Sequence, residues 1–146
     1  MSQENVEVAR GWYEVVNRWL ESYWASPGRP LGETPGTDGV FDRMCQDAEW
    51  DWLFSPETFR GREQLLRAAA DFIDTVGEWR IEVEELIDGD RNRVLAILRV
   101  LARGRGSGVP VYQRVFSVIT VREGRIARIH DHTDRAKALE AAGLRE

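Results

Sequence analysis

The second half of the chain holds a run of β-type segments, and this run constrains the fold more than any other feature. The segments lie at roughly 79–88, 93–104, 111–122 and 125–133. Gly89-Asp90 and Glu123-Gly124, which separate two of these pairs, are typical of tight turns. The pattern therefore predicts a meander of antiparallel strands.

Segment 93–104 is apolar on both faces. Side chains alternate along a strand, so Val94 and Leu98 share one face, whereas Leu95 and Ile97 share the other. A strand that is apolar on both faces is buried on both. Because helices packed on the sheet can cover one face, we expect the other face to form a homodimer interface.

The first half of the chain has the periodicity of helices. The expected elements there are helices at 3–22, about 40–47 and 61–76, with one short strand at 49–52. A last short helix should begin after Asp134 as its N-cap and stop at Gly143. Helices that precede a run of strands indicate an α+β fold, here one domain over 1–146.

Residues 25–40 break this pattern. They contain three of the five prolines and four of the thirteen glycines in the chain. The composition predicts a long irregular loop, which serves either as a lid or binding loop or as a surface insertion.

Composition argues against several partners. The net charge is −5, and no apolar run approaches the roughly 20 residues that span a bilayer, so we expect no nucleic-acid partner and no membrane. The N-terminus lacks the apolar segment of a signal peptide, and the single Cys45 fits a reducing compartment, so we expect a cytoplasmic protein. We find no phosphate loop or dinucleotide motif, and we expect no cofactor and no resident metal.

Several short stretches are distinctive when they are considered together. They are VARGWYEVVN at 8–17, DAEWD at 47–51, FRGRE at 59–63, GSGVPV at 106–111, REGRI at 122–126 and DRAKALEAAGL at 134–144. On these stretches the chain resembles the nuclear transport factor 2-like superfamily and, within it, the SnoaL-like proteins of actinobacterial type. The resemblance covers nearly the whole chain except residues 19–40.

This resemblance implies a cone-shaped, curved antiparallel or mixed sheet of the cystatin-like type. Helices would pack on its concave face, with a pocket at the open end and frequent dimerisation through the sheet. The fold hosts isomerases, cyclases, epoxide hydrolases, dehydratases and non-catalytic binders, so it does not assign a function by itself.

Asp131 is the strongest catalytic candidate. In the expected last strand it shares a face with the apolar Ile129 and Ala127. Loss of hydration there raises the pKa of a carboxyl group and makes it a general base near neutral pH. In SnoaL-like cyclases an acid at a similar place is the catalytic acid/base, and the resemblance implies that role here. The alternative is a solvated or arginine-paired aspartate.

His130 and His132 lie on the opposite face of that strand. Two histidines at this spacing can reach one metal ion, but the spacing nominates no third ligand. The alternative is an exposed or dimer-facing pair. A β-bulge would change the parity and bring one histidine into the pocket for acid–base work.

Arg99 lies in the middle of segment 93–104. It needs a partner such as Glu85 or Asp131, or it binds an anionic or carbonyl group of a ligand. Epoxide hydrolases of this fold use an Asp-Arg-Asp arrangement, but Leu101 stands where the second acid belongs. A structural ion pair is therefore favoured over that chemistry.

Tyr13 lies in the region where ketosteroid isomerases of this fold carry an oxyanion-binding tyrosine, although Trp12 fits the alignment equally well. In those enzymes an acid on the first strand is the base. Here Trp52 takes the place of that acid, and Asp51 is one residue away on the other face. This departure argues against a steroid isomerase of that type and leaves Tyr13 as a core residue or an assisting donor.

The chain has six tryptophans, a high number for 146 residues. They could line an aromatic pocket for a flat apolar ligand, or they could fill the core and a dimer interface. The candidate ligand-binding residues are Trp12, Trp50, Trp52, Phe72, Phe116 and His132.

Three functions stay open at this point. The first is a cofactor-free acid–base enzyme acting on a small apolar carbonyl or cyclic compound, with Asp131 as the base and Tyr13, His130 or Arg99 assisting. The second is a binding protein for a small apolar molecule that it does not turn over. The third is a dimerising domain without a ligand.

Overall fold

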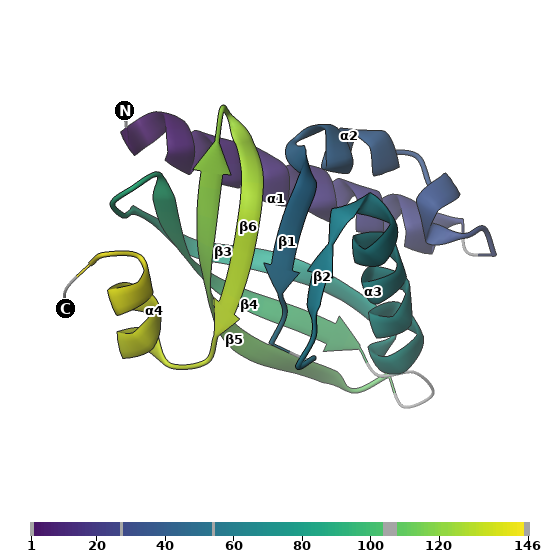
Figure 1. Ribbon diagram of the computed structural model, residues 1–146. Helices are drawn as coiled ribbons and strands as arrows, with labels where there is room; N and C mark the ends of the chain where they lie inside the picture. The colour runs from purple at the N-terminus through teal and green to yellow at the C-terminus, as the bar shows by residue number, and fades with distance from the viewer. Residues whose placement is uncertain (1, 27, 54, 104–107, 145–146) are drawn as a thin grey trace.

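A six-stranded curved sheet forms the centre of the protein (Figure 1). The structure is a computed structural model, which describes residues 2–26, 28–53, 55–103 and 108–144. The strands are β1 (Met44–Asp51), β2 (Thr58–Arg60), β3 (Glu78–Asp88), β4 (Arg93–Arg103), β5 (Pro110–Arg122) and β6 (Arg125–His132). They lie in the order β2-β1-β6-β5-β4-β3, in which β1 pairs with β6 in parallel and all other pairs are antiparallel.

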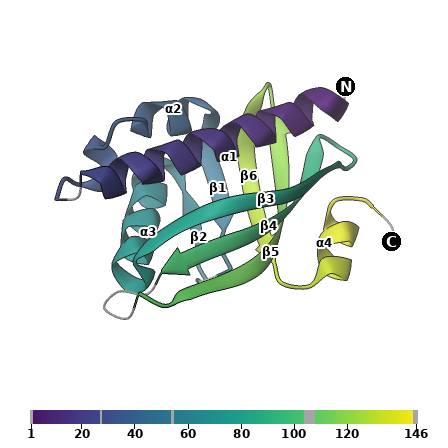
Figure 2. The ribbon, with the colours of Figure 1, turned by 180° about the vertical axis from the view of Figure 1, so that it is seen from behind.

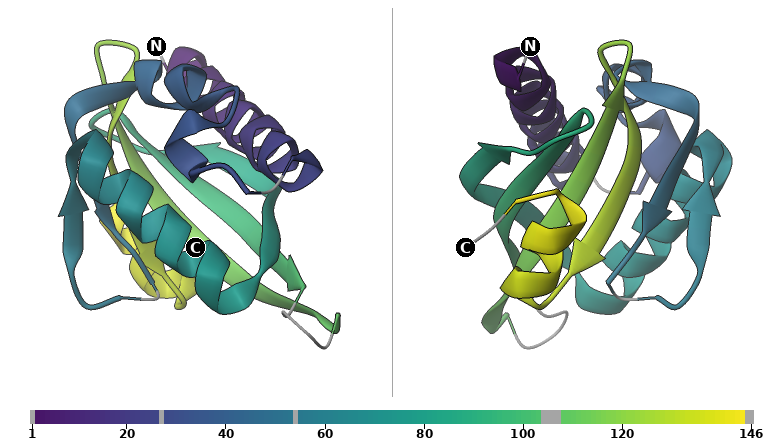
Figure 3. Two further views of the ribbon diagram at one scale, coloured as in Figure 1. Left: turned by 90° about the vertical axis from the view of Figure 1, so that its right-hand side faces the viewer. Right: turned by 60° about the vertical axis from the view of Figure 1, so that its left-hand side comes forward.

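The long helices pack on the concave face of the sheet. The helical elements are α1 (Ser2–Ala25), the short 3₁₀ helix η1 (Leu31–Glu33), α2 (Thr37–Asp42), α3 (Gly61–Val76) and α4 (Arg135–Ala141). Figure 2 shows α1 crossing the sheet, and the left view of Figure 3 shows the sheet curving around α1 and α3. The α+β class, the curved sheet and the meander from β3 to β6 are confirmed.

The main core lies between these helices and the concave face. The α1 stripe that includes Ala9, Val16 and Leu20 meets Val94 and Leu98 of β4 in one buried cluster. These α1 residues recur at helical spacing, and burial of that apolar stripe is what stabilises a helix of this kind. The same spacing directs Tyr13 into the interior.

The convex face of the sheet is covered in part by α4, as the right view of Figure 3 shows. Leu95 and Ile97 of β4 join Phe116 in a second buried cluster beneath Ala138 and Leu139 of this helix. The expectation that helices cover only one face was therefore wrong, because α4 buries the outer apolar residues within the same chain. A homodimer through the sheet stays a prediction.

The segment before β1 differs from its expected structure. The predicted helix at 40–47 was wrong in its bounds, because α2 occupies Thr37–Asp42 and Met44 already pairs with Ile126 in the sheet. The expected loop at 25–40 contains η1 and the start of α2. The hydrogen bonds of a buried threonine hold the start of α2 in place. Thr37 accepts a hydrogen bond from the Trp19 indole at 2.8 Å and donates one to the Thr34 carbonyl at 2.7 Å.

One further difference is small. The three-residue strand β2 pairs with β1 and was not predicted, since so short a segment shows no periodicity. Gly106 and Ser107 of the GSGVPV stretch lie outside the described residues. Among the helices of the described ranges, none is both long and apolar enough to cross a bilayer.

Candidate functional site

Asp131 lies on the concave face of β6, where three donors hold its carboxylate. The Ser117 hydroxyl donates to Oδ1 at 2.7 Å, and the Trp50 indole and the Leu53 backbone N–H donate to Oδ2 at 3.2 and 3.3 Å. The sheet order explains the arrangement, because β1 and β5 are the two neighbours of β6. Each flanking strand, or the loop that follows it, therefore contributes to the site.

Tyr13 of α1 completes a small cavity with this carboxylate. The residue is only 2% exposed, and its hydroxyl has no hydrogen-bond partner among the described residues. The cavity has a volume of about 20 Å³. Its wall includes Tyr13, Trp50, Trp52, Phe72, Ser117 and Asp131. A space of this size holds about one water molecule.

The electrostatics of the two groups differ from those of free side chains. Burial raises the pKa of Asp131, although the hydrogen bonds from Ser117, Leu53 and Trp50 oppose this rise by stabilising the carboxylate. Burial and the negative charge of Asp131 together raise the pKa of Tyr13 far above its ordinary value. The Ser117 hydroxyl lies near the Tyr13 hydroxyl and opposes this rise in the pKa, although the two groups do not form a hydrogen bond. The Tyr13 hydroxyl therefore keeps its proton at any ordinary pH and can act as a hydrogen-bond donor.

Aromatic rings form most of the remaining wall. Trp50 contacts Trp52 at a ring-centroid distance of 5.4 Å, and Trp52 contacts Phe72 at 4.8 Å. Trp12 lies behind this wall, 6.1 Å from Trp50 and 5.1 Å from Tyr13. Four of the six predicted ligand-binding residues thus gather around one interior region.

The structure does not bring Arg99, His130, His132 or Phe116 to this cavity. All four lie on the convex face. Asp131 pairs with Ser117, and the odd-numbered residues of β5 and β6 point inward there, so Phe116, His130 and His132 point outward. On β4, Arg99 shares its face with Leu95 and Ile97, which pack under α4. Phe116 packs under α4. The roles expected for these residues beside Asp131 therefore have no geometric basis.

Arg99 has partners that the sequence did not indicate. Its guanidinium lies 3.4 Å from Glu82 and stacks over the Tyr112 ring at 4.6 Å. The predicted partner Glu85 pairs with Ile97, whereas a β-bulge between Val83 and Glu85 places Glu82 directly opposite Arg99. The arginine thus belongs to a surface ion pair, as the sequence favoured, but with Glu82.

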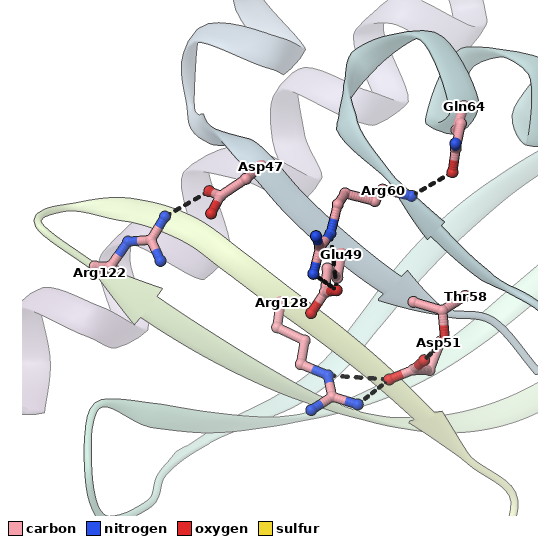
Figure 4. A network of polar contacts seen from close by, with 8 residues as sticks. All are labelled: Asp47, Glu49, Asp51, Thr58, Arg60, Gln64, Arg122 and Arg128. Atoms are coloured by element: carbon pink, nitrogen blue, oxygen red, sulfur yellow. Dashed lines mark hydrogen bonds and ion pairs between the residues drawn. The ribbon is translucent and has the colours of Figure 1, made fainter.

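Ion pairs also follow the convex side of β1 (Figure 4). Asp47 accepts from Arg122 at 2.6 Å, and Glu49 accepts from Arg60 Nε at 3.0 Å. Asp51 accepts from Thr58 and from Arg128. Burial alone would raise the pKa of Asp51, but these hydrogen bonds outweigh it and lower the pKa. Asp51 is therefore an ionised structural group and no candidate base.

The two histidines stack on each other, with ring centroids 4.4 Å apart. Burial and the neighbouring His130 lower the pKa of His132. His130 Nδ1 lies 3.9 Å from Asp51. In the part of the chain that the structure describes, no group of three or more His, Cys, Asp or Glu side chains could hold a metal ion.

Ser117, whose hydroxyl donates to Asp131, was not predicted from the sequence. A β-bulge between Thr120 and Val121 moves the register of β5 against β6 by one residue. Without this bulge the tight turn at Glu123-Gly124 would place Phe116 opposite Asp131. No feature of the sequence marks the bulge, so the sequence did not indicate Ser117, and Phe116 was predicted for the pocket only as an aromatic residue.

A family model described as the SnoaL-like domain matches residues 33–129, about two thirds of the chain. The chain belongs to the SnoaL-like domain family. The resemblance inferred from short stretches is thus confirmed, whereas the actinobacterial type stays a prediction. Among curated proteins, none matches the sequence.

Solved structures support the same fold for this SnoaL-like protein. An NTF2-like protein of unknown function from Burkholderia pseudomallei superposes with a TM-score of 0.69 at 19% identity, covering 97% of this chain and 98% of that one. TerC, co-crystallised with polyporic acid, has a TM-score of 0.67 at 18% identity, with coverages of 95% and 97%. A protein assigned as a SnoaL-like polyketide cyclase from Jannaschia has a TM-score of 0.63 at 18% identity, with coverages of 100% and 96%. At these identities the similarity shows the fold alone.

Proposed function

We propose that this SnoaL-like protein is a cofactor-free acid–base enzyme, with Asp131 as the general base and Tyr13 as a hydrogen-bond donor. The substrate would be a small apolar cyclic compound with a carbonyl group. One observation carries the proposal: a desolvated carboxylate shares a small interior cavity with a buried hydroxyl that has no partner among the described residues. Pairs of this kind are typical of proton-transfer sites.

The proposed chemistry is proton abstraction next to the carbonyl. The Asp131 carboxylate takes the proton from the carbon, and the electron pair of that C–H bond moves into the enolate, with negative charge on oxygen. The Tyr13 hydroxyl donates a hydrogen bond to this oxygen, which stabilises the charge as it develops. Reprotonation by Asp131 at another carbon would complete an isomerisation, and reprotonation at the same carbon gives exchange.

Substrate entry requires a change in the aromatic wall, because the small interior cavity holds only about one water molecule. Trp52 and Phe72 line this cavity and also line an open cleft of about 710 Å³ on the other side. Both rings therefore lie between the site and solvent. Their displacement toward the cleft would enlarge the cavity.

A second candidate is a binding protein that holds a small apolar molecule without turnover. The co-crystallisation of TerC with polyporic acid favours small-molecule binding by proteins of this shape. In that case the affinity would not depend on the charge of Asp131. The ligand-free dimerising domain is less favoured, since it gives no reason for a desolvated carboxylate beside a buried hydroxyl.

Exchange of α-protons tests the proposal. The protein would be incubated in D₂O with 1-tetralone and related small cyclic ketones, and loss of the α-proton signals would be followed by NMR. We expect the wild-type protein to accelerate exchange. With Asp131→Asn, exchange should be at least about a hundredfold slower. Asp47→Asn makes the same change on the convex face and should exchange at the wild-type rate. Equal rates for wild type and Asp131→Asn would contradict the proposal and favour the binding protein.

A further inference from the structure

Trp79 occupies a junction between three spaces in the protein. It lies near the start of β3 and is 6% exposed. Its side chain lines the cavity of Asp131, a second interior cavity of about 30 Å³, and an open groove of about 510 Å³ between the end of α1 and strands β3 to β5. A ligand that enters from the groove therefore meets Trp79 before it reaches either cavity.

The second cavity lies between α1, α3 and the sheet, and two of the residues that line it carry buried indole N–H groups without a hydrogen-bond partner among the described residues. Four tryptophans line it. Trp19 donates to Thr37 and Trp50 donates to Asp131, whereas the indole N–H groups of Trp12 and Trp79 have no hydrogen-bond partner among the described residues. Both of these atoms are buried. Buried donors in native proteins are nearly always paired, so two unpaired donors around one cavity call for a physical reason.

The other residues of this wall cannot satisfy them. They are Val16, Val40, Phe41, Met44, Leu65 and Ala69, none of which offers a strong acceptor side chain. A single water molecule could accept from both indoles, but its own protons would face an apolar wall. An acceptor oxygen without protons, such as a carbonyl, fits this set of groups better.

On this basis, and given the proposed function, we propose that Trp79 is a specificity-determining residue of the interior site. Its indole N–H donates to an acceptor oxygen of the ligand, and the indole of Trp12, which lines the same cavity, is a second donor. The interior thus selects ligands that carry a hydrogen-bond acceptor in addition to an apolar ring. A ligand with one carbonyl, such as 1-tetralone, places that oxygen at these indoles in this binding mode and at Tyr13 in the mode that leads to proton transfer. This selection therefore operates in binding and is separate from proton transfer at Asp131.

Two probes of the same shape test the inference. 1-Tetralone carries a carbonyl oxygen, whereas tetralin has the same ring skeleton without it. Each would be titrated into ¹⁵N-labelled full-length protein, and the six indole N–H signals would be followed. We expect tetralone to bind saturably and to move the Trp79 and Trp12 indole protons downfield. We expect tetralin to bind about tenfold more weakly and to leave these two protons without a downfield shift.

Variants give a second, independent measurement. Trp79→Phe keeps an aromatic ring and removes the donor, so it should weaken tetralone binding by about tenfold and leave tetralin binding within about twofold. Trp24→Phe is the matched control, because Trp24 lines the same groove and its indole N–H also has no partner in the described part of the chain, but it lines neither interior cavity. It should leave the affinity for both probes unchanged. The wild-type titration does not depend on the stability of either variant.

Three results would overturn the inference. They are a Trp79 indole signal that stays in place while tetralone binds, an equal loss of affinity for both probes in Trp79→Phe, and no saturable binding of either probe. The proposed function fails separately. If Asp131→Asn exchanges like wild type while the Trp79 results hold, only the catalytic proposal is lost. If exchange depends on Asp131 while Trp79→Phe binds both probes normally, only this inference is lost.

Discussion

Asn17 secures the edge strand β3, which contributes Trp79 and Ile81 to the wall of the site. Its substitution should therefore lower the stability of the protein. Its side-chain amide donates to the Ile81 carbonyl at 2.6 Å, and its Oδ1 accepts from the Ile81 N–H at 2.9 Å. Since β3 is the last strand in the sheet order, Ile81 has no strand neighbour on this side. Asn17 of α1 therefore pairs with the edge as a further strand would.

The expected loss in Asn17→Ala follows from these two bonds. A typical intramolecular hydrogen bond contributes about 1 kcal/mol, so two contribute about 2 kcal/mol. Ile81 is buried, and water would reach its freed backbone groups poorly, which adds to the loss. We therefore expect the free energy of unfolding to fall by about 2 to 3 kcal/mol.

Urea unfolding followed by tryptophan fluorescence measures this change. Asn5→Ala is the control, because Asn5 makes one exposed hydrogen bond, to Asn92, and should lose less than about 0.5 kcal/mol. If Asn17→Ala unfolds within about 0.5 kcal/mol of wild type, the argument that this amide secures the edge of the sheet is refuted.

Two other substitutions test the core and the site. Thr37→Val leaves the buried Trp19 indole N–H without its acceptor, so unfolding should become about 1 to 3 kcal/mol easier in urea, whereas Thr75→Val on the exposed side of α3 should change little. Asp131→Asn should gain stability relative to wild type as the pH rises from about 4, because a raised pKa makes ionisation costlier in the folded chain than in the unfolded one. Urea curves across pH measure this difference, and a difference that does not change with pH would count against a desolvated carboxylate.

The fold was largely predictable because its signals are local. Turn residues such as Glu123-Gly124 and the apolar residues on both faces of β4 specify the meander, and Asp134 caps α4 through hydrogen bonds from two backbone N–H groups. The placement of α2 was not predictable, since it depends on the contact between Thr37 and Trp19, which are far apart on the chain.

The candidate site was predictable only in part. Asp131 and Tyr13 could be nominated from strand parity and helical spacing, because both periodicities are short-range. The neighbours of Asp131 could not, because one bulge in β6 places Ser117 instead of Phe116 opposite Asp131. The convex-face position of Leu95 and Ile97 was read correctly, but their cover comes from α4, whose docking is a tertiary contact.

The pKa of Asp131 tests the central claim most directly. A ¹³C NMR titration of the side-chain carboxyl, assigned with Asp131→Asn, measures it in the folded protein. The account predicts a value clearly above the value of about 4 for a free aspartate, because the carboxyl is desolvated beside Tyr13. A value at or below that reference would mean that the carboxylate is solvated or stabilised by its donors, and it would contradict the role of Asp131 as a general base.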